Sequence, residues 1–167
     1  MDSPEYFMRE AVAEAAYSAA RGYGKPFGAV VVRNGEIIGR GYNDVFRSND
    51  PSAHAELNAI REACKKLGQI TLHNCELYAT GQPCLMCLAA IFLAQLPVLY
   101  YANSYTDAEA LGYFGGKGVA CMACALGLAA DNFSGDFVSS RALTVTRLPL
   151  PEALDLYTQW KDQGKSL

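Results

Sequence analysis

The chain has 167 residues, of which 51% are hydrophobic and 19% are charged. This length suits one domain with a sizeable core, and this composition excludes a disordered chain. The formal net charge of −3 offers no overall positive field to a nucleic acid. No run approaches the ~20 apolar residues that a membrane span needs. We therefore expect one globular domain over residues 1–167, with no membrane anchor.

The first part of the chain predicts a helix followed by a β-hairpin. Pro4 suits the first turn of the helix, and Gly22 marks its end. Two β-rich runs follow, at residues 27–33 and 36–40. The Asn34-Gly35 pair between them is a strong signal for a two-residue hairpin turn, so these runs are expected to pair with each other.

The remainder of the chain alternates between helical and extended patterns. After a polar loop, Ser52 is the expected N-cap of a second helix and Gly68 its end. The expected elements are a helix at 53–67, a strand at 75–80, a helix at 83–95, a strand at 98–102, a strand at 142–147 and a helix at 149–161. Residues 106–136 carry no clear period. Five strands with intervening helices predict an α/β sandwich around one sheet.

Two short segments carry the candidate chemistry. His54-Ala55-Glu56 precedes Pro83-Cys84-Leu85-Met86-Cys87, and each segment is expected at the start of a helix. A catalytic zinc site takes three nitrogen or sulfur ligands and leaves its fourth position to water. His54, Cys84 and Cys87 supply such a set, with one Zn²⁺ per chain as the expected cofactor.

Glu56 lies two residues after the histidine and is the candidate catalytic acid and base. Zinc lowers the pKa of a bound water to about 7, so a nearby carboxylate can accept the proton released at neutral pH. Residues two apart in a helix point in directions about 200° apart, so Glu56 is expected to project past the metal toward a substrate. The sequence thus predicts a hydrolytic enzyme.

Other functions of the cysteines remain open alternatives. A lone Cys-x-x-Cys is often a redox pair or half of a structural zinc site, and Cys121 and Cys124 form a second such pair. However, 33 residues separate the two pairs, more than the 15 to 20 typical of a four-cysteine zinc ribbon. We expect Cys121 and Cys124 to pack within the apolar run of residues 119–130.

These motifs resemble those of the cytidine deaminase superfamily, whose zinc enzymes share an H-x-E…P-C-x-x-C signature. Within it the chain is most similar to the guanine deaminase branch. The matching segments are residues 25–32, Asn43, residues 49–56, 59–61, 83–87 and 101–108. The resemblance implies a three-layer α/β/α cytidine-deaminase-like fold around a five-stranded mixed sheet. It also implies hydrolytic deamination of a small amino-substituted heterocycle, with guanine converted to xanthine and ammonia as the first candidate.

The resemblance assigns further roles by position. Asn43 matches an asparagine that hydrogen-bonds the purine edge, and Phe27 matches an aromatic residue that flanks the base. Asn43 also suits a turn, and Phe27 also suits an ordinary strand core. Members of this branch are usually homodimers, so a homodimer is expected here. Because the chain begins without a signal-like segment and its six cysteines suit a reducing compartment, we expect it in the cytoplasm.

The chain departs from the guanine deaminase pattern at three places. No carboxylate stands in residues 112–116, where that branch carries an acid that recognises the guanine amidine edge. The chain ends in Leu167 rather than tyrosine, and Gly81-Gln82 replaces a Cys-Glu or Ser-Glu pair. The candidate substitutes for this acid are Asp107, Glu109 and Asp136.

Three alternative functions follow. A deaminase of cytosine, a pterin or an aminotriazine would fit the altered pocket. A tRNA adenosine deaminase shares the zinc motif but should show a basic surface, whereas residues 149–167 mix acids with lysines. A non-catalytic zinc-binding domain has no use for Glu56. We therefore expect a small-molecule substrate and no nucleic acid partner.

Overall fold

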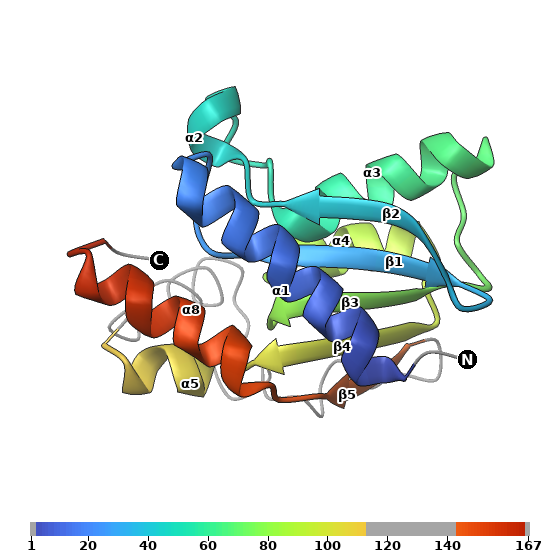
Figure 1. Ribbon diagram of the computed structural model, residues 1–167. Coiled ribbons are helices and arrows are strands. Elements are labelled where there is room, and N and C mark those ends of the chain that lie inside the picture. Colours follow the sequence, from blue (N-terminus) through green and yellow to red (C-terminus); the bar gives the residue numbers. More distant parts are fainter. Residues whose placement is uncertain (1–2, 113–142, 166–167) are drawn as a thin grey trace, which may run out of the picture.

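The computed structural model describes residues 3–112 and 143–165, which share one five-stranded sheet of order β2-β1-β3-β4-β5 (Figure 1). β1 pairs antiparallel with β2 and β3, whereas β3, β4 and β5 run parallel. The strands are β1 (Gly28–Arg33), β2 (Glu36–Tyr42), β3 (Glu76–Gly81), β4 (Val98–Asn103) and β5 (Thr144–Arg147). The predicted mixed sheet is confirmed.

Helices cover both faces of the sheet (Figure 1). The helices are α1 (Pro4–Arg21), α2 (Val45–Ser48), α3 (Ala55–Leu67), α4 (Leu85–Leu93), α5 (Tyr105–Ala110) and α8 (Pro151–Asp162). Because successive strand residues face opposite sides, Val30 and Val32 pack with α1 and α8, and Ala29 and Val31 pack with α3 and α4. This arrangement confirms the three-layer α/β/α fold.

Two glycines let helices approach the sheet closely. A β-carbon on Gly41 would lie 2.1 Å from the carbonyl oxygen of Ala55 at the start of α3. A β-carbon on Gly28 would lie 2.0 Å from the carbonyl oxygen of Ala11 in α1. No real β-carbon fits at such distances, so only glycine permits this packing. Gly41 thereby determines how close the first turn of α3 lies to β2.

The hairpin prediction is confirmed, but two helices begin later than predicted. Asn34 and Gly35 both adopt left-handed backbone angles, with φ of 53° and 80°, as a tight hairpin turn requires. The second helix was expected from residue 53 with Ser52 as its cap, which is wrong, because Ser52 bonds to Asp50. The Asp50 carboxylate accepts both the backbone N–H and the hydroxyl of Ser52 at 2.7 Å, which forms a local turn.

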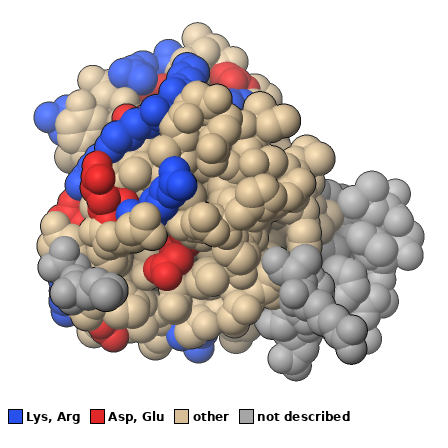
Figure 2. Space-filling view, turned by 90° about the vertical axis from the view of Figure 1, so that its right-hand side faces the viewer, with Lys and Arg blue, Asp and Glu red and all other residues tan. Residues whose placement is uncertain are grey.

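Charge is mixed on the face that carries the β1–β2 turn. Figure 2 shows Lys and Arg side chains there beside Asp and Glu, next to a broad area without charge. One ion pair of this kind joins Lys66 to Glu36 at 3.0 Å. Over residues 3–112 and 143–165, no helix is long and apolar enough to cross a bilayer. The predictions for Cys121, Cys124 and residues 119–130 lie outside the described residues.

Candidate metal centre and substrate cavity

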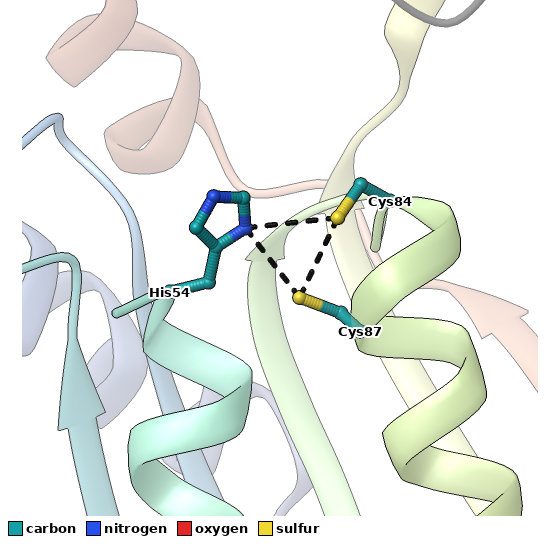
Figure 3. A group of neighbouring side chains, drawn as sticks. All are labelled: His54, Cys84 and Cys87. Carbon is teal, nitrogen blue, oxygen red and sulfur yellow. Dashed lines mark hydrogen bonds between the residues drawn. The ribbon is translucent and has the colours of Figure 1, made fainter. Parts of the chain in front are cut away.

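The beginnings of α3 and α4 lie side by side and bring the three predicted ligands together (Figure 3). His54 is the N-cap of α3 and Cys84 the N-cap of α4, both with extended backbone angles. Cys87 lies one turn into α4 and is fully buried. We predicted both helices to start before these residues. The observed N-cap positions instead turn His54 and Cys84 toward the gap between the helix ends.

The three side chains form a nearly equilateral triangle. The His54 Nδ1 atom lies 3.6 Å from Cys84 Sγ and 3.5 Å from Cys87 Sγ, and the two sulfurs are 3.7 Å apart. Zinc–sulfur bonds of about 2.3 Å and zinc–nitrogen bonds of about 2.0 Å at tetrahedral angles require separations of about 3.8 Å between sulfurs and about 3.6 Å from nitrogen to sulfur. The triangle therefore fits three corners of a tetrahedral zinc site.

The surroundings of Cys84 favour its thiolate, the form that binds a metal. The hydrogen bonds of Cys84 with Cys87 and His54 lower the pKa of the Cys84 thiol to about 4. Two helix N-termini point their positive ends at the same place, which also stabilises a thiolate. A thiolate beside a histidine nitrogen is the donor set that zinc prefers.

Glu56 lies beside this triangle and is not part of it. Among the described residues, the group whose ligand atoms lie within 4.8 Å of one another contains only His54, Cys84 and Cys87. The Glu56 side chain is buried, and that burial raises the pKa of its carboxyl group. A raised pKa suits a group that must both accept and return a proton near neutral pH.

A cavity of about 630 Å³ opens beside the triangle. The cavity is lined by the predicted substrate-binding residues Phe27 and Asn43. It is also lined by Glu56 and by two of the three candidate ligands, His54 and Cys84. Lining residues that the sequence analysis missed include Lys25, Gln82, Asn103, Tyr105 and Tyr157.

The side chain of Asn43 has a fixed orientation. Its Oδ1 atom accepts the backbone N–H of Lys25 at 2.9 Å, and Asn43 is only 2% exposed. An amide whose oxygen is engaged in this way can offer its NH₂ group to a ligand. Asn43 is therefore arranged as a donor, and both its backbone and its side chain contribute to the loop before β1.

Phe27 precedes β1 and belongs to both the core and the cavity wall. Its ring packs edge-on against Tyr157 of α8, with ring centroids 5.5 Å apart and an interplanar angle of 80°. Tyr105 opens α5, and its hydroxyl donates to the carbonyl of Pro83 at 2.9 Å, just before α4. The sequence carried one signal for α5, the Ser104-x-x-Asp107 capping box, which the structure contains.

Three acids were candidates to replace the missing guanine-recognition residue. Neither of the two that lie in the described part of the chain, Asp107 and Glu109, lines the cavity. Asp107 accepts the N–H and hydroxyl of Ser104 and pairs with Arg147 at 2.8 Å. Glu109 is exposed, and Asp136 lies outside the described residues. Among the described residues that line the cavity, Glu56 is the only acid.

Comparisons with known proteins place these features in context. The family described as "Cytidine and deoxycytidylate deaminase zinc-binding region" matches residues 1–103. Guanine deaminase of Bacillus subtilis is 49% identical over 109 residues, covering 65% of this chain and 70% of the relative. Its X-ray structure superposes with a TM-score of 0.69 at 37% identity over 96% and 95% of the two chains. A tRNA-specific adenosine deaminase of Aquifex aeolicus is 42% identical over 98 residues, covering 59% and 64%.

Proposed function

This chain belongs to the cytidine and deoxycytidylate deaminase family of zinc-dependent hydrolytic deaminases, and we propose that it converts guanine to xanthine and ammonia. The observation that carries the proposal is that His54, Cys84 and Cys87 form a ligand triangle beside a cavity that Glu56 also lines and that has room for a heterocycle. The near full-length similarity to a guanine deaminase structure supports guanine as the first candidate.

In this proposal, His54, Cys84 and Cys87 hold the zinc ion and Glu56 moves protons. Zinc at this position would supply a nucleophilic water at neutral pH. Glu56 accepts a proton from that water and delivers it to the ring nitrogen beside the attacked carbon. Glu56 then takes the second proton of the added water and passes it to the exocyclic amine, which leaves as ammonia while the carbon keeps the water oxygen. Glu56 is 8% exposed, so bulk water has little access to its side chain.

Asn43 and Phe27 orient the ring in this proposal. The fixed NH₂ group of Asn43 donates to an acceptor atom on the ring edge, and the Phe27 ring contacts the heterocycle. A wrong ring that leaves the buried Asn43 donor unpaired would lose about 1–3 kcal/mol of binding. These contacts would select among rings of similar size.

A tRNA adenosine is the second candidate substrate, because a tRNA-specific adenosine deaminase is 42% identical to this chain over 98 residues. Net charge disfavours this candidate, since the chain carries 17 acidic and 14 basic residues. A tRNA-binding site would require a basic surface. A base supplied as a free small molecule requires no such surface.

We also propose that two copies pair in solution. The segment Leu85–Leu93 contains no charged residue, yet its Phe92 and Leu93 side chains are 45% and 81% exposed. A second copy would cover such an apolar helix. Light scattering of the purified protein would give twice the chain mass, and a mass of one chain would contradict the pairing.

The test is ammonia release by the zinc-loaded protein with guanine, adenine, cytosine, cytidine, pterins, aminotriazines and a tRNA. Guanine should be the best substrate. Glu56→Gln should retain one zinc per chain while losing turnover, because it keeps the shape of the side chain and removes its ability to move protons. If the protein deaminates another ring faster than guanine, that ring replaces guanine as the proposed substrate, and the proposed deamination chemistry stands. Full activity of Glu56→Gln would overturn the proposed mechanism.

A further inference from the structure

Tyr157 reaches from α8 across the end of β3. Its side chain is 2% exposed, and its ring packs edge-on against Phe27. A β-carbon on Gly81, the last residue of β3, would lie 2.6 Å from the Tyr157 hydroxyl oxygen. It would also lie 3.0 Å from the ring of Phe27. The Tyr157 hydroxyl therefore occupies the space that a side chain at position 81 would otherwise fill.

Asn103 holds this hydroxyl in place. In the register of the parallel strands, Asn103 of β4 stands opposite Gly81 of β3. Its Nδ2 atom donates to the carbonyl of Ala153 in α8 at 2.8 Å, and its side chain also hydrogen-bonds to the phenol of Tyr157. The end of β4 thus binds α8 at two points one turn apart and fixes the position of the phenol.

Tyr157 lines the same cavity as Glu56. Gly81, Asn103 and Tyr157 all line that cavity together with Glu56 and Asn43. Burial raises the pKa of Tyr157 well above its usual range, so the hydroxyl stays neutral. A neutral phenol can both donate and accept a hydrogen bond, which suits a ring edge with a carbonyl or a ring nitrogen.

We propose that Tyr157 is a specificity-determining residue whose hydroxyl hydrogen-bonds the substrate ring, and that Gly81 is required to make room for it. The substrate class is a neutral heterocycle that presents a hydrogen-bonding edge to α8 while Asn43 contacts another of its edges. The inference rests on the proposed deamination of a small ring. It holds for guanine or for another ring of that class.

The first experiment removes only the hydroxyl. Tyr157→Phe should lower kcat/KM for the preferred ring by about 10-fold, and it should change the ratio of kcat/KM values among the rings of the panel. Zinc content and melting temperature should stay close to those of the wild type. Tyr100→Phe is the matched control, because Tyr100 stacks on Tyr78 at 4.7 Å on the sheet and does not line the cavity.

An equal loss for every ring in Tyr157→Phe would show a structural effect alone and overturn the proposal. Unchanged kinetics would overturn it as well, while leaving the proposed deamination standing. If the wild type releases ammonia from no ring of the panel, the proposed function fails and this inference fails with it. These outcomes are distinguishable in one set of assays.

A second experiment tests the space that Gly81 leaves for the hydroxyl. Gly81→Ala should lower kcat/KM strongly when Tyr157 is present, because the methyl group and the hydroxyl oxygen cannot both fit. In the Tyr157→Phe background the same change should cost at least 5-fold less, since only the contact with the Phe27 ring remains. Equal losses of kcat/KM in the two backgrounds would show that positions 81 and 157 act independently. That result would overturn the claim that Gly81 makes room for the Tyr157 hydroxyl.

Discussion

Gly41→Ala should push the start of α3 away from β2 and thereby disturb the metal centre. The new methyl group would lie 2.1 Å from the Ala55 carbonyl oxygen and 2.4 Å from the Ala59 nitrogen, both backbone atoms of α3. α3 must retreat by about 0.9 Å before the first contact reaches even 3.0 Å, and such overpacking costs about 1–3 kcal/mol of stability. His54, the N-cap of α3, moves with it. A displacement of about 1 Å at a reacting group lowers the rate by about 100-fold.

The assay measures zinc content by mass spectrometry, zinc affinity by competition with a chelator, and ammonia release. Gly41→Ala should bind zinc more weakly and lose most activity. Gly28→Ala is the matched control, since its methyl group would lie 2.0 Å from a backbone oxygen of α1 on the opposite face of the sheet. It should lose comparable stability but keep its zinc affinity. Equal zinc affinities in the two variants would refute the reasoning that β2 positions His54 through α3.

Three further predictions follow from the site and its supports. Asn43→Asp keeps the acceptor for the Lys25 N–H but loses the NH₂ donor, so kcat/KM should fall about 10- to 100-fold. Activity at the wild-type level would exclude Asn43 as a donor. Ser104→Ala removes the capping box of α5 and should cost about 1 kcal/mol in urea unfolding, and an unchanged midpoint would contradict that role. Removal of zinc by a chelator should lower the melting temperature, and added zinc should restore it, because the ion binds the folded chain.

The metal triangle was predictable because its determinants are local. His54 with Glu56 and Cys84 with Cys87 are short spacings, and each pair lies at the start of a helix that the sequence pattern also indicates. The N-cap positions were not predicted. Ser52 is a good cap by residue type, but Asp50 engages it in a turn, and this competition between neighbouring polar groups moves the helix start by two residues.

The far wall of the cavity was not predictable because it depends on contacts distant in sequence. Asn103 and Ala153 are 50 residues apart, and Tyr157 belongs to a helix whose pattern alone shows only an apolar face. Asp107 was suggested as a substrate-binding acid, but the structure uses it in a helix cap and an ion pair with Arg147. An acidic residue that the sequence places in a capping box should therefore not be assigned a role in substrate binding.

The positions of these residues explain how one zinc centre can serve different substrates. All three candidate ligands and Glu56 lie within residues 1–103, the region that matches the family. The chain is 49% identical to a guanine deaminase over 109 residues and 42% identical to a tRNA adenosine deaminase over 98 residues. Tyr105 and Tyr157 line the same cavity but lie beyond residue 103. Because the candidate ligands lie in the first region and part of the cavity wall lies beyond it, we expect changes in α5 and α8 to alter the substrate without disturbing the candidate ligands. Substrate specificity should therefore follow residues such as Tyr157 more closely than overall identity in the zinc-binding region.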